Sequence, residues 1–243
     1  MTLLTSLLVA GVIVLVSSFV RGITGFGLAL TAFPFLVLFI PPKEVVVLLA
    51  IINLCFSIIY ILRGKRSYRT KDVLNVSIFC IAGVLVGFFL LKFIPDNGLK
   101  LLTGSVIVLS GISLLLGVKL RISNLTVAYS VSSLLGGILA GSTTIGGPVV
   151  ALILTGSDLP RDRFRNSMSL FFLFSYGSAV IMYLADSMIN SDTLVYAASS
   201  IPFLVTGLIL GEFLSKKINQ KYFRILVLVL LLVMGSRMII TSL

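Results

Sequence analysis

Arg21-Gly-Ile-Thr-Gly-Phe-Gly27 and Ala140-Gly-Ser-Thr-Thr-Ile-Gly-Gly-Pro148 are two glycine-rich stretches that interrupt the two longest apolar blocks of the chain. Those blocks, at roughly 2–40 and 124–156, are too long for single membrane-spanning helices of about 20 residues each. Glycine and proline at this density break a helix. A broken backbone at membrane depth is tolerated where it is buried in protein or lines a wet cavity. We therefore expect both stretches to form turns inside a membrane protein.

The composition places the whole chain in the membrane. Of its 243 residues, 58% are hydrophobic and only 11% are charged, whereas about 25% of a soluble domain is charged. Six further apolar blocks have about the length of one spanning helix, and they lie at roughly 44–62, 73–94, 99–118, 166–185, 193–214 and 222–242. The sequence predicts an all-α polytopic membrane protein.

The residue types argue against an enzyme or a metal protein. The chain has no histidine, and its two cysteines, Cys55 and Cys80, lie apart inside apolar runs. Histidine-based metal sites and acid–base chemistry are therefore excluded, and the cysteines are interpreted as packing residues. We expect no metal and no cofactor.

An internal duplication is indicated by four matches in the same order. Gly22-x-Thr24-x-x-Gly27 matches Gly141-x-Thr143-x-x-Gly146 at an offset of 119 residues, Pro42-Lys43-Glu44 matches Pro160-Arg161-Asp162 at 118, and both Gly83-x-x-x-Gly87 with Gly207-x-x-x-Gly211 and Gly111 with Gly235 match at 124. The near-constant offset predicts two repeats, 1–118 and 119–243, within one membrane domain. The two GxxxG pairs are interpreted as helix-packing faces.

The loop charges orient the repeats. The loop between the second and third blocks carries a basic cluster of Arg63, Lys65, Arg66, Arg69 and Lys71. The equivalent loop of the second half has no basic residue and carries Asp186 and Asp192. Because cytoplasmic loops are rich in Lys and Arg, equivalent loops lie on opposite sides, which requires an inverted repeat.

An inverted repeat needs an odd number of crossings in each half. We therefore predict that each half is a broken, re-entrant helical hairpin followed by three transmembrane helices. This topology puts fourteen basic residues in the cytoplasm and only Lys43, Lys92 and Lys100 in outside loops. It makes both termini extracytoplasmic and brings the two glycine-rich tips together. The net charge of +11 then comes mainly from the cytoplasmic loops of a protein in a lipid bilayer, and it does not indicate a nucleic-acid-binding surface. The sequence is also compatible with a homo-oligomer.

The two tips are predicted to bind a small anion near the middle of the membrane. Helices that start after Gly27 and Gly147 present free N–H groups and the positive ends of their dipoles. Arg21 is the only charged residue among the first forty, so a bound oxyanion would act as its counter-ion. The candidate substrate-binding residues are Arg21, Gly22, Thr24, Gly25, Gly27, Gly141, Ser142, Thr143, Thr144, Gly146 and Gly147.

Structural interpretations stand beside these functional ones. Arg21 could instead reach an interface or backbone carbonyls, and the glycines could serve packing alone. Asn53, Ser57 and Ser175 either line the path or make local or interhelical hydrogen bonds. The aromatic residues Phe171, Phe172 and Phe174 are expected to be core or lipid-facing, and Glu212 is expected at the membrane interface.

The chain resembles the sulfite exporter TauE/SafE family of bacterial and archaeal anion permeases. The resemblance rests on Gly22-Ile-Thr-Gly-Phe-Gly27 followed by Pro34, and on Gly136-Gly-Ile-Leu-Ala-Gly-Ser-Thr-Thr-Ile-Gly-Gly-Pro148. It implies export of sulfite, sulfonates or related sulfur-containing anions across the bacterial or archaeal plasma (inner) membrane. The alternatives are a permease for another small anion or carboxylate and a non-transporting membrane assembly subunit.

Overall fold

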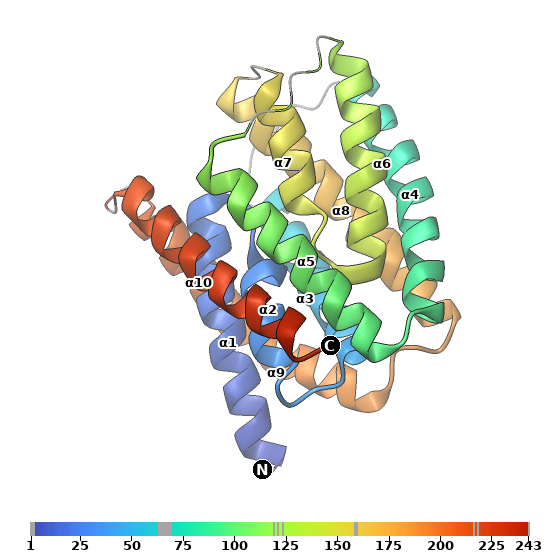
Figure 1. Ribbon diagram of the computed structural model, residues 1–243, viewed down its shortest axis with the longest axis vertical. Coiled ribbons are helices and arrows are strands. Elements are labelled where there is room, and N and C mark those ends of the chain that lie inside the picture. The colour runs from blue at the N-terminus through green and yellow to red at the C-terminus, as the bar shows by residue number, and fades with distance from the viewer. Residues whose placement is uncertain are drawn as a thin grey trace.

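The structure, a computed structural model, describes residues 3–62, 70–118, 120, 122, 124–157, 160–215, 217 and 219–242. Every regular element in these residues is an α-helix (Figure 1). The helices are α1 (Leu3–Thr24), α2 (Leu28–Leu36), α3 (Pro42–Leu62), α4 (Thr70–Phe93), α5 (Asp96–Leu115), α6 (Leu125–Thr143), α7 (Gly147–Gly156), α8 (Arg161–Ala185), α9 (Ser191–Leu214) and α10 (Gln220–Ile240).

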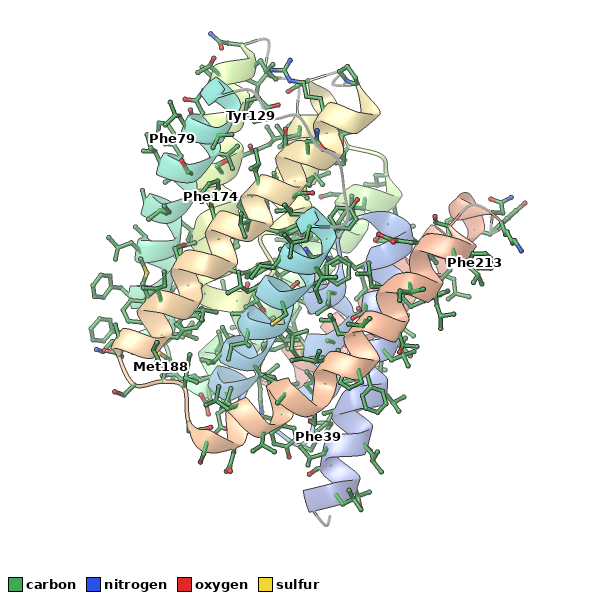
Figure 2. All side chains as sticks on the ribbon, turned by 180° about the vertical axis from the view of Figure 1, so that it is seen from behind. Phe39, Phe79, Tyr129, Phe174, Met188 and Phe213 are labelled. Carbon is green, nitrogen blue, oxygen red and sulfur yellow. The ribbon has the colours of Figure 1, made fainter. Side chains whose placement is uncertain are left out.

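Seven of the described helices, α1, α3, α4, α5, α6, α8 and α9, are long and apolar enough to cross a membrane. Large apolar side chains also cover the outside of the bundle, where a soluble protein would carry charge. Phe213 is 59% exposed, and Figure 2 shows Phe79 and Phe213 at the outer edges of the bundle. The chain is a multi-pass membrane protein, as its composition predicts.

Both glycine-rich stretches form turns between a long helix and a short helix. The first connects α1 to the 9-residue α2, and the second connects α6 to the 10-residue α7. Each short helix packs against its long partner. In Figure 1, α6 descends from the top of the view and α7 returns upward beside it. The predicted helix breaks are therefore confirmed in their positions.

The two halves repeat the same order of helix lengths, one long, one short and three long. Their closest packing is also reciprocal. The most extensive interhelical contacts join α4 to α6 and α1 to α9. These two pairs are equivalent, because α4 corresponds to α9 and α1 corresponds to α6 in the order of helices. In addition, α5 packs on its counterpart α10, and α3 packs on its counterpart α8. A duplicated fold would produce such equivalent helix pairs. The inverted orientation of the two repeats and their boundary between residues 118 and 119 stay predictions.

The GxxxG pairs lie where two helices approach most closely. A methyl group added at Gly83 or Gly87 of α4 would lie 2.3 or 2.2 Å from a carbonyl oxygen of α6. A methyl group at Gly207 or Gly211 of α9 would lie 2.3 or 2.5 Å from a carbonyl oxygen of α1. No side chain fits at those distances, so the prediction that these glycines are packing faces is confirmed.

Charged residues of three predicted outside loops come together at one end of the bundle. The Lys92 Nζ lies 2.6 Å from Asp186 Oδ1, and the Lys43 Nζ donates to the Lys92 carbonyl at 3.2 Å. The predicted cytoplasmic residues Arg63, Lys65, Arg66, Arg69, Lys119, Arg121 and Lys216 lie outside the described residues. Which end faces the cytoplasm therefore stays a prediction from the charge bias.

Candidate anion site

A cavity of about 420 Å³ leads into the bundle and reaches the first glycine-rich tip. Its inner wall consists of the consecutive residues 20–27, and α2, α3, α5, α7, α8 and α10 supply the other walls. Gly117 and Val118 also line it and are exposed, so the cavity opens to the surface after α5. Because Lys119 and Arg121 follow directly in the sequence, this opening lies on the side predicted to be cytoplasmic.

Arg21, in the last turn of α1, lies at the inner end of this cavity. Only 4% of its surface is exposed. Its Nη1 donates to Asn53 Oδ1 at 2.5 Å, and its Nη2 donates to Ser57 Oγ at 3.2 Å. In the described part of the chain, no carboxylate forms a salt bridge with it. The guanidinium is thus a buried charge whose polar partners in the protein are neutral, an arrangement that favours an external anion as counter-ion.

Asn53 and Ser57 are fixed on α3 by their own hydrogen bonds. The Asn53 Nδ2 donates to the Leu49 carbonyl, and the Ser57 hydroxyl donates to the Asn53 carbonyl, both at 2.7 Å. The Asn53 Oδ1 and the Ser57 Oγ therefore remain available to accept hydrogen bonds from Arg21. The interhelical hydrogen bonds considered from the sequence are therefore present, and Ser57 also lines the cavity.

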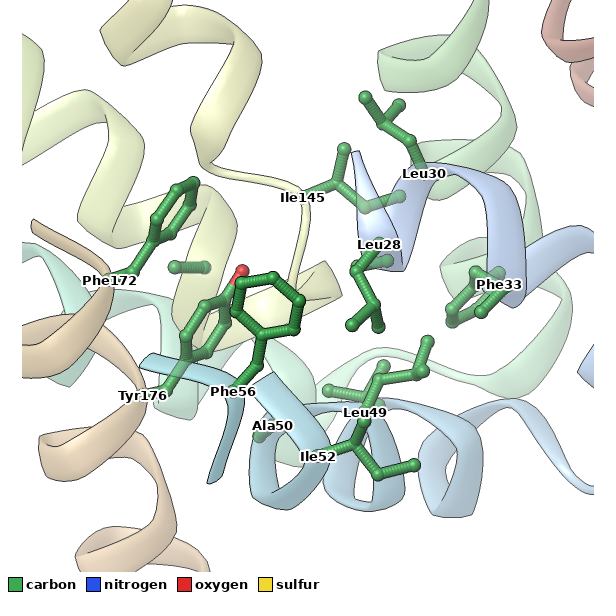
Figure 3. Close-up of a cluster of buried hydrophobic side chains, with 14 of the residues drawn as sticks. Leu28, Leu30, Phe33, Leu49, Ala50, Ile52, Phe56, Ile145, Phe172 and Tyr176 are labelled. Atoms are coloured by element: carbon green, nitrogen blue, oxygen red, sulfur yellow. The ribbon is translucent and has the colours of Figure 1, made fainter. Parts of the chain in front are cut away.

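Two aromatic rings cover the Arg21 guanidinium. The ring centroid of Phe56, from α3, lies 4.1 Å from Cζ, and that of Phe172, from α8, lies 4.3 Å away. Phe172 in turn stacks on Tyr176 with an interplanar angle of 7°. Figure 3 shows Phe56, Phe172 and Tyr176 on the same side of Leu28. The contact between Phe172 and Arg21 was not foreseen, because no sequence spacing links α1 to α8.

The first tip is a turn open to the cavity. Gly25 and Gly27 have φ angles of 85° and 106°, a left-handed conformation that glycine adopts without strain. The Thr24 hydroxyl has the carbonyls of Val20, at 2.9 Å, and of Phe26 as its acceptors, and it accepts from the Phe26 N–H at 3.4 Å. Residues 23–27 are partly exposed and line the cavity.

The second tip repeats the threonine pattern. The Thr143 hydroxyl donates to the Leu139 carbonyl at 2.8 Å and accepts from the Ile145 N–H at 3.3 Å. Thr24 and Thr143 therefore bond to the carbonyl four residues back and the N–H two residues on. In both tips, the structure gives the threonine hydroxyl a partner within its own turn.

The surroundings of the second tip differ from those of the first. Residues 141–148 are all buried. Two tyrosines of α8 hold the backbone of this tip: the Tyr183 hydroxyl donates to the Gly141 carbonyl at 2.7 Å, and the Tyr176 hydroxyl donates to the Thr144 carbonyl at 2.9 Å. The second tip is thus closed by α8.

The two tips contact each other. A methyl group added at Gly147 would lie 3.6 Å from the Cβ of Phe26 and 3.0 Å from the ring of Phe172. A gap of about 10 Å³ separates the tips, and Arg21, Gly27 and Thr144 are among the residues that line it. The helix starts at α2 and α7 therefore lie on either side of a small space that Arg21 also reaches.

The predicted site residues fall into three groups. Arg21, Gly22, Thr24, Gly25 and Gly27 line the large cavity, and Thr144 and Gly147 line the gap between the tips. Gly141, Ser142, Thr143 and Gly146 line neither space, and Ser175 is buried with its hydroxyl 3.4 Å from the Phe172 carbonyl.

Gly22 and Gly141 also serve helix packing. A methyl group on Gly22 would lie 3.0 Å from the Cα of Gly211, and one on Gly141 would lie 2.5 Å from the Val84 carbonyl oxygen. The described residues contain no cluster of three or more His, Cys, Asp or Glu side chains that could hold a metal ion.

A multi-pass helical protein with a cavity that ends on a buried cation between two helix breaks has the architecture of an anion transporter. The model of the sulfite exporter TauE/SafE family matches residues 9–238. The chain therefore belongs to that family, which is one of membrane transporters for sulfite or related anions. No curated protein and no solved structure matches the chain.

Proposed function

We propose that this protein exports small sulfur-containing anions, such as sulfite or organosulfonates, across a bacterial or archaeal plasma membrane. The observation that carries the proposal is Arg21. It is a buried guanidinium with neutral protein partners, at the inner end of a cavity of about 420 Å³. An anion in that cavity would supply the missing negative charge and form charge-assisted hydrogen bonds.

The geometry suggests how the anion would be held. It would enter from the cytoplasmic side past Val118 and accept hydrogen bonds from Arg21. Gly25 and Gly27 expose backbone at the cavity wall, where no Cβ keeps the ion away. The first N–H groups of α2, which follow Gly27 at the cavity wall, have no partner within their helix and would face an anion bound at the first tip.

The direction of transport follows from charge. Among the described residues, no acidic side chain lines the cavity, so none of them is placed to carry a coupled proton there. With a negative cell interior, moving one negative charge outward is favoured by about 2.3 kcal/mol per 100 mV. An uncoupled anion uniporter would therefore act as an exporter.

Flux measurements on protein in liposomes test the function. Sulfite and methanesulfonate should give an electrogenic flux that follows the imposed membrane potential, and the halides chloride and bromide should give less. Equal flux of all four anions would show that the protein does not select sulfur oxyanions. Absence of flux with folded protein would favour the alternative that the protein is a non-transporting assembly subunit.

Cysteine labelling tests the proposed topology. With the native Cys55 and Cys80 replaced by serine, Ser191→Cys should react with an impermeant thiol reagent added to intact cells, whereas Asn219→Cys should be protected. Ser191 is the first residue of α9, and Asn219 lies in the connection between α9 and α10. Labelling of the 219 site from outside would contradict the inverted repeat and place the cavity opening on the other side of the membrane.

A further inference from the structure

Two buried aromatic rings lie against the Arg21 guanidinium. The Cζ of Arg21 lies 4.1 Å from the ring centroid of Phe56 and 4.3 Å from that of Phe172. These rings come from different helices, α3 and α8, and only 2% and 4% of their surfaces are exposed. An anion that approached the Arg21 Cζ from the side of either ring would have to displace that ring. The N–H groups along the guanidinium edge, away from the two rings, then offer the most direct approach.

The edge offers donors in a fixed plane. Of the five N–H groups of arginine, Asn53 and Ser57 take two. Three remain without an acceptor in the described part of the chain. Their directions are set by the planar guanidinium, and the two rings packed against it restrict its reorientation. A ligand with two oxygens on one atom matches two parallel N–H groups, whereas a monatomic ion meets such a pair less well.

We propose that Phe56 and Phe172 determine the specificity of the site by confining bound anions to the edge of Arg21. The pair therefore selects anions with two oxygens on one centre, as in sulfite, sulfonates and carboxylates, over halides and linear anions. This inference rests on the proposed function, because it assumes that Arg21 binds the transported anion. The two rings are positioning residues for Arg21 and a steric barrier to other approaches.

A competition series with the wild-type protein gives the first test. Purified protein is titrated with sulfite, methanesulfonate, acetate, bromide and thiocyanate, and the dissociation constants are compared. The three anions with two oxygens on one atom should bind at least about tenfold more tightly than bromide and thiocyanate, the loss expected for one charge-assisted hydrogen bond. Bromide binding as tight as sulfite binding would overturn the inference without any variant.

Phe56→Leu and Phe172→Leu give the second test, with Phe33→Leu as the matched control. Leucine keeps the site apolar but removes one of the two rings from the guanidinium. The preference for sulfite over bromide should fall by up to about tenfold in each site variant. Phe33 is also fully buried, lies on α2 and lines neither the cavity nor the gap, so its variant should keep the wild-type preference.

The ratio of affinities separates this role from simple packing. If the rings only support the fold, each variant lowers the affinity for every anion alike and leaves the ratio unchanged, which would refute the inference. Because the rings lie on different helices, either variant that folds is sufficient. If wild-type protein binds none of these anions, the proposed function itself fails, and that result is distinct from an unchanged ratio in a protein that does bind sulfite.

Discussion

The two glycine-rich tips share two internal threonine hydrogen bonds and have different surroundings. Thr24 and Thr143 each bond to the carbonyl four residues back and the N–H two residues on. Residues 23–27 are nevertheless partly exposed in the cavity, whereas 141–148 are buried beneath α8. Local sequence therefore determines the turn, and the helices packed around it determine whether an ion can reach it.

This difference has a consequence for transport. An inverted-repeat transporter exposes its site alternately to the two sides of the membrane. In this structure the first tip is accessible from one side and the second tip is closed by Tyr176 and Tyr183. We interpret this as a state open to the side predicted to be cytoplasmic, in which release of the second tip from α8 would open the other side.

The largest effect is expected when the charge of Arg21, beside the open first tip, is removed. Arg21→Gln should weaken sulfite binding by about tenfold to a hundredfold, because charge-assisted hydrogen bonds are lost. Arg21→Lys should be intermediate, since it keeps the charge but not the planar donors. Binding and liposome flux are the measurements. Arg237→Gln makes the same charge change on an exposed residue of α10 and should behave as wild type.

A smaller effect, on stability, should distinguish the closed tip from the open tip. A methyl group on Gly146 would lie 2.0 Å from the Gly136 carbonyl oxygen, whereas one on Gly25 would meet no described atom within 4 Å. Gly25→Ala should cost only the strain of a left-handed alanine, about 1–2 kcal/mol, and Gly146→Ala should cost more. Thermal unfolding in detergent measures both. Gly177→Ala, whose methyl would lie 3.9 Å from Leu54, is the control, and equal losses at the two tips would contradict the comparison.

Removing the tyrosine hydrogen bonds that hold the closed second tip should make its backbone more accessible to solvent, as the backbone of the open first tip is. Tyr183→Phe and Tyr176→Phe each leave a buried tip carbonyl without its donor, at a cost of about 1–3 kcal/mol. Hydrogen exchange of residues 141–148 should accelerate, while that of 23–27 should not change. The hydroxyl of Tyr196 bonds to Ser6 instead, so Tyr196→Phe should affect neither tip. Unchanged exchange in both α8 variants would show that other contacts hold the second tip closed.

The smallest effects are expected for the matched threonines. Thr24→Val and Thr143→Val each remove a hydrogen bond inside the turn, at about 1 kcal/mol of stability. Only Thr24 lines the cavity, so only Thr24→Val should also weaken sulfite binding. Calorimetric titration of both variants measures this difference. A larger binding loss for Thr143→Val would mean that the anion approaches the second tip.

The sequence predicted the features that depend on local composition. The glycine-rich stretches do break α1 and α6, and Gly83, Gly87, Gly207 and Gly211 do face neighbouring helices at backbone distance. These properties follow from glycine itself, which breaks helices and allows close approach wherever it occurs. Burial of Arg21 was one of two readings, because a single arginine within an apolar block could also have reached a membrane interface.

Features that depend on contacts between distant helices could not be read from the sequence. Asn53 bonds to Arg21 across 32 positions, and Phe172 lies on the same guanidinium from α8. Tyr183 reaches Gly141 across 42 positions. No periodicity indicates which face of α8 meets which tip, so the aromatic cover of Arg21 and the closure of the second tip required the three-dimensional arrangement.

Selenite, a heavier analogue of sulfite, provides the most direct test that Arg21 binds the anion. Anomalous diffraction at the selenium edge, from crystals grown with selenite, would locate the ion independently of any model of transport. The account predicts a peak at the inner end of the cavity, within hydrogen-bonding distance of the Arg21 guanidinium edge and beside Gly25 and Gly27. A peak elsewhere in the protein, with Arg21 still bonded only to Asn53 and Ser57, would contradict it.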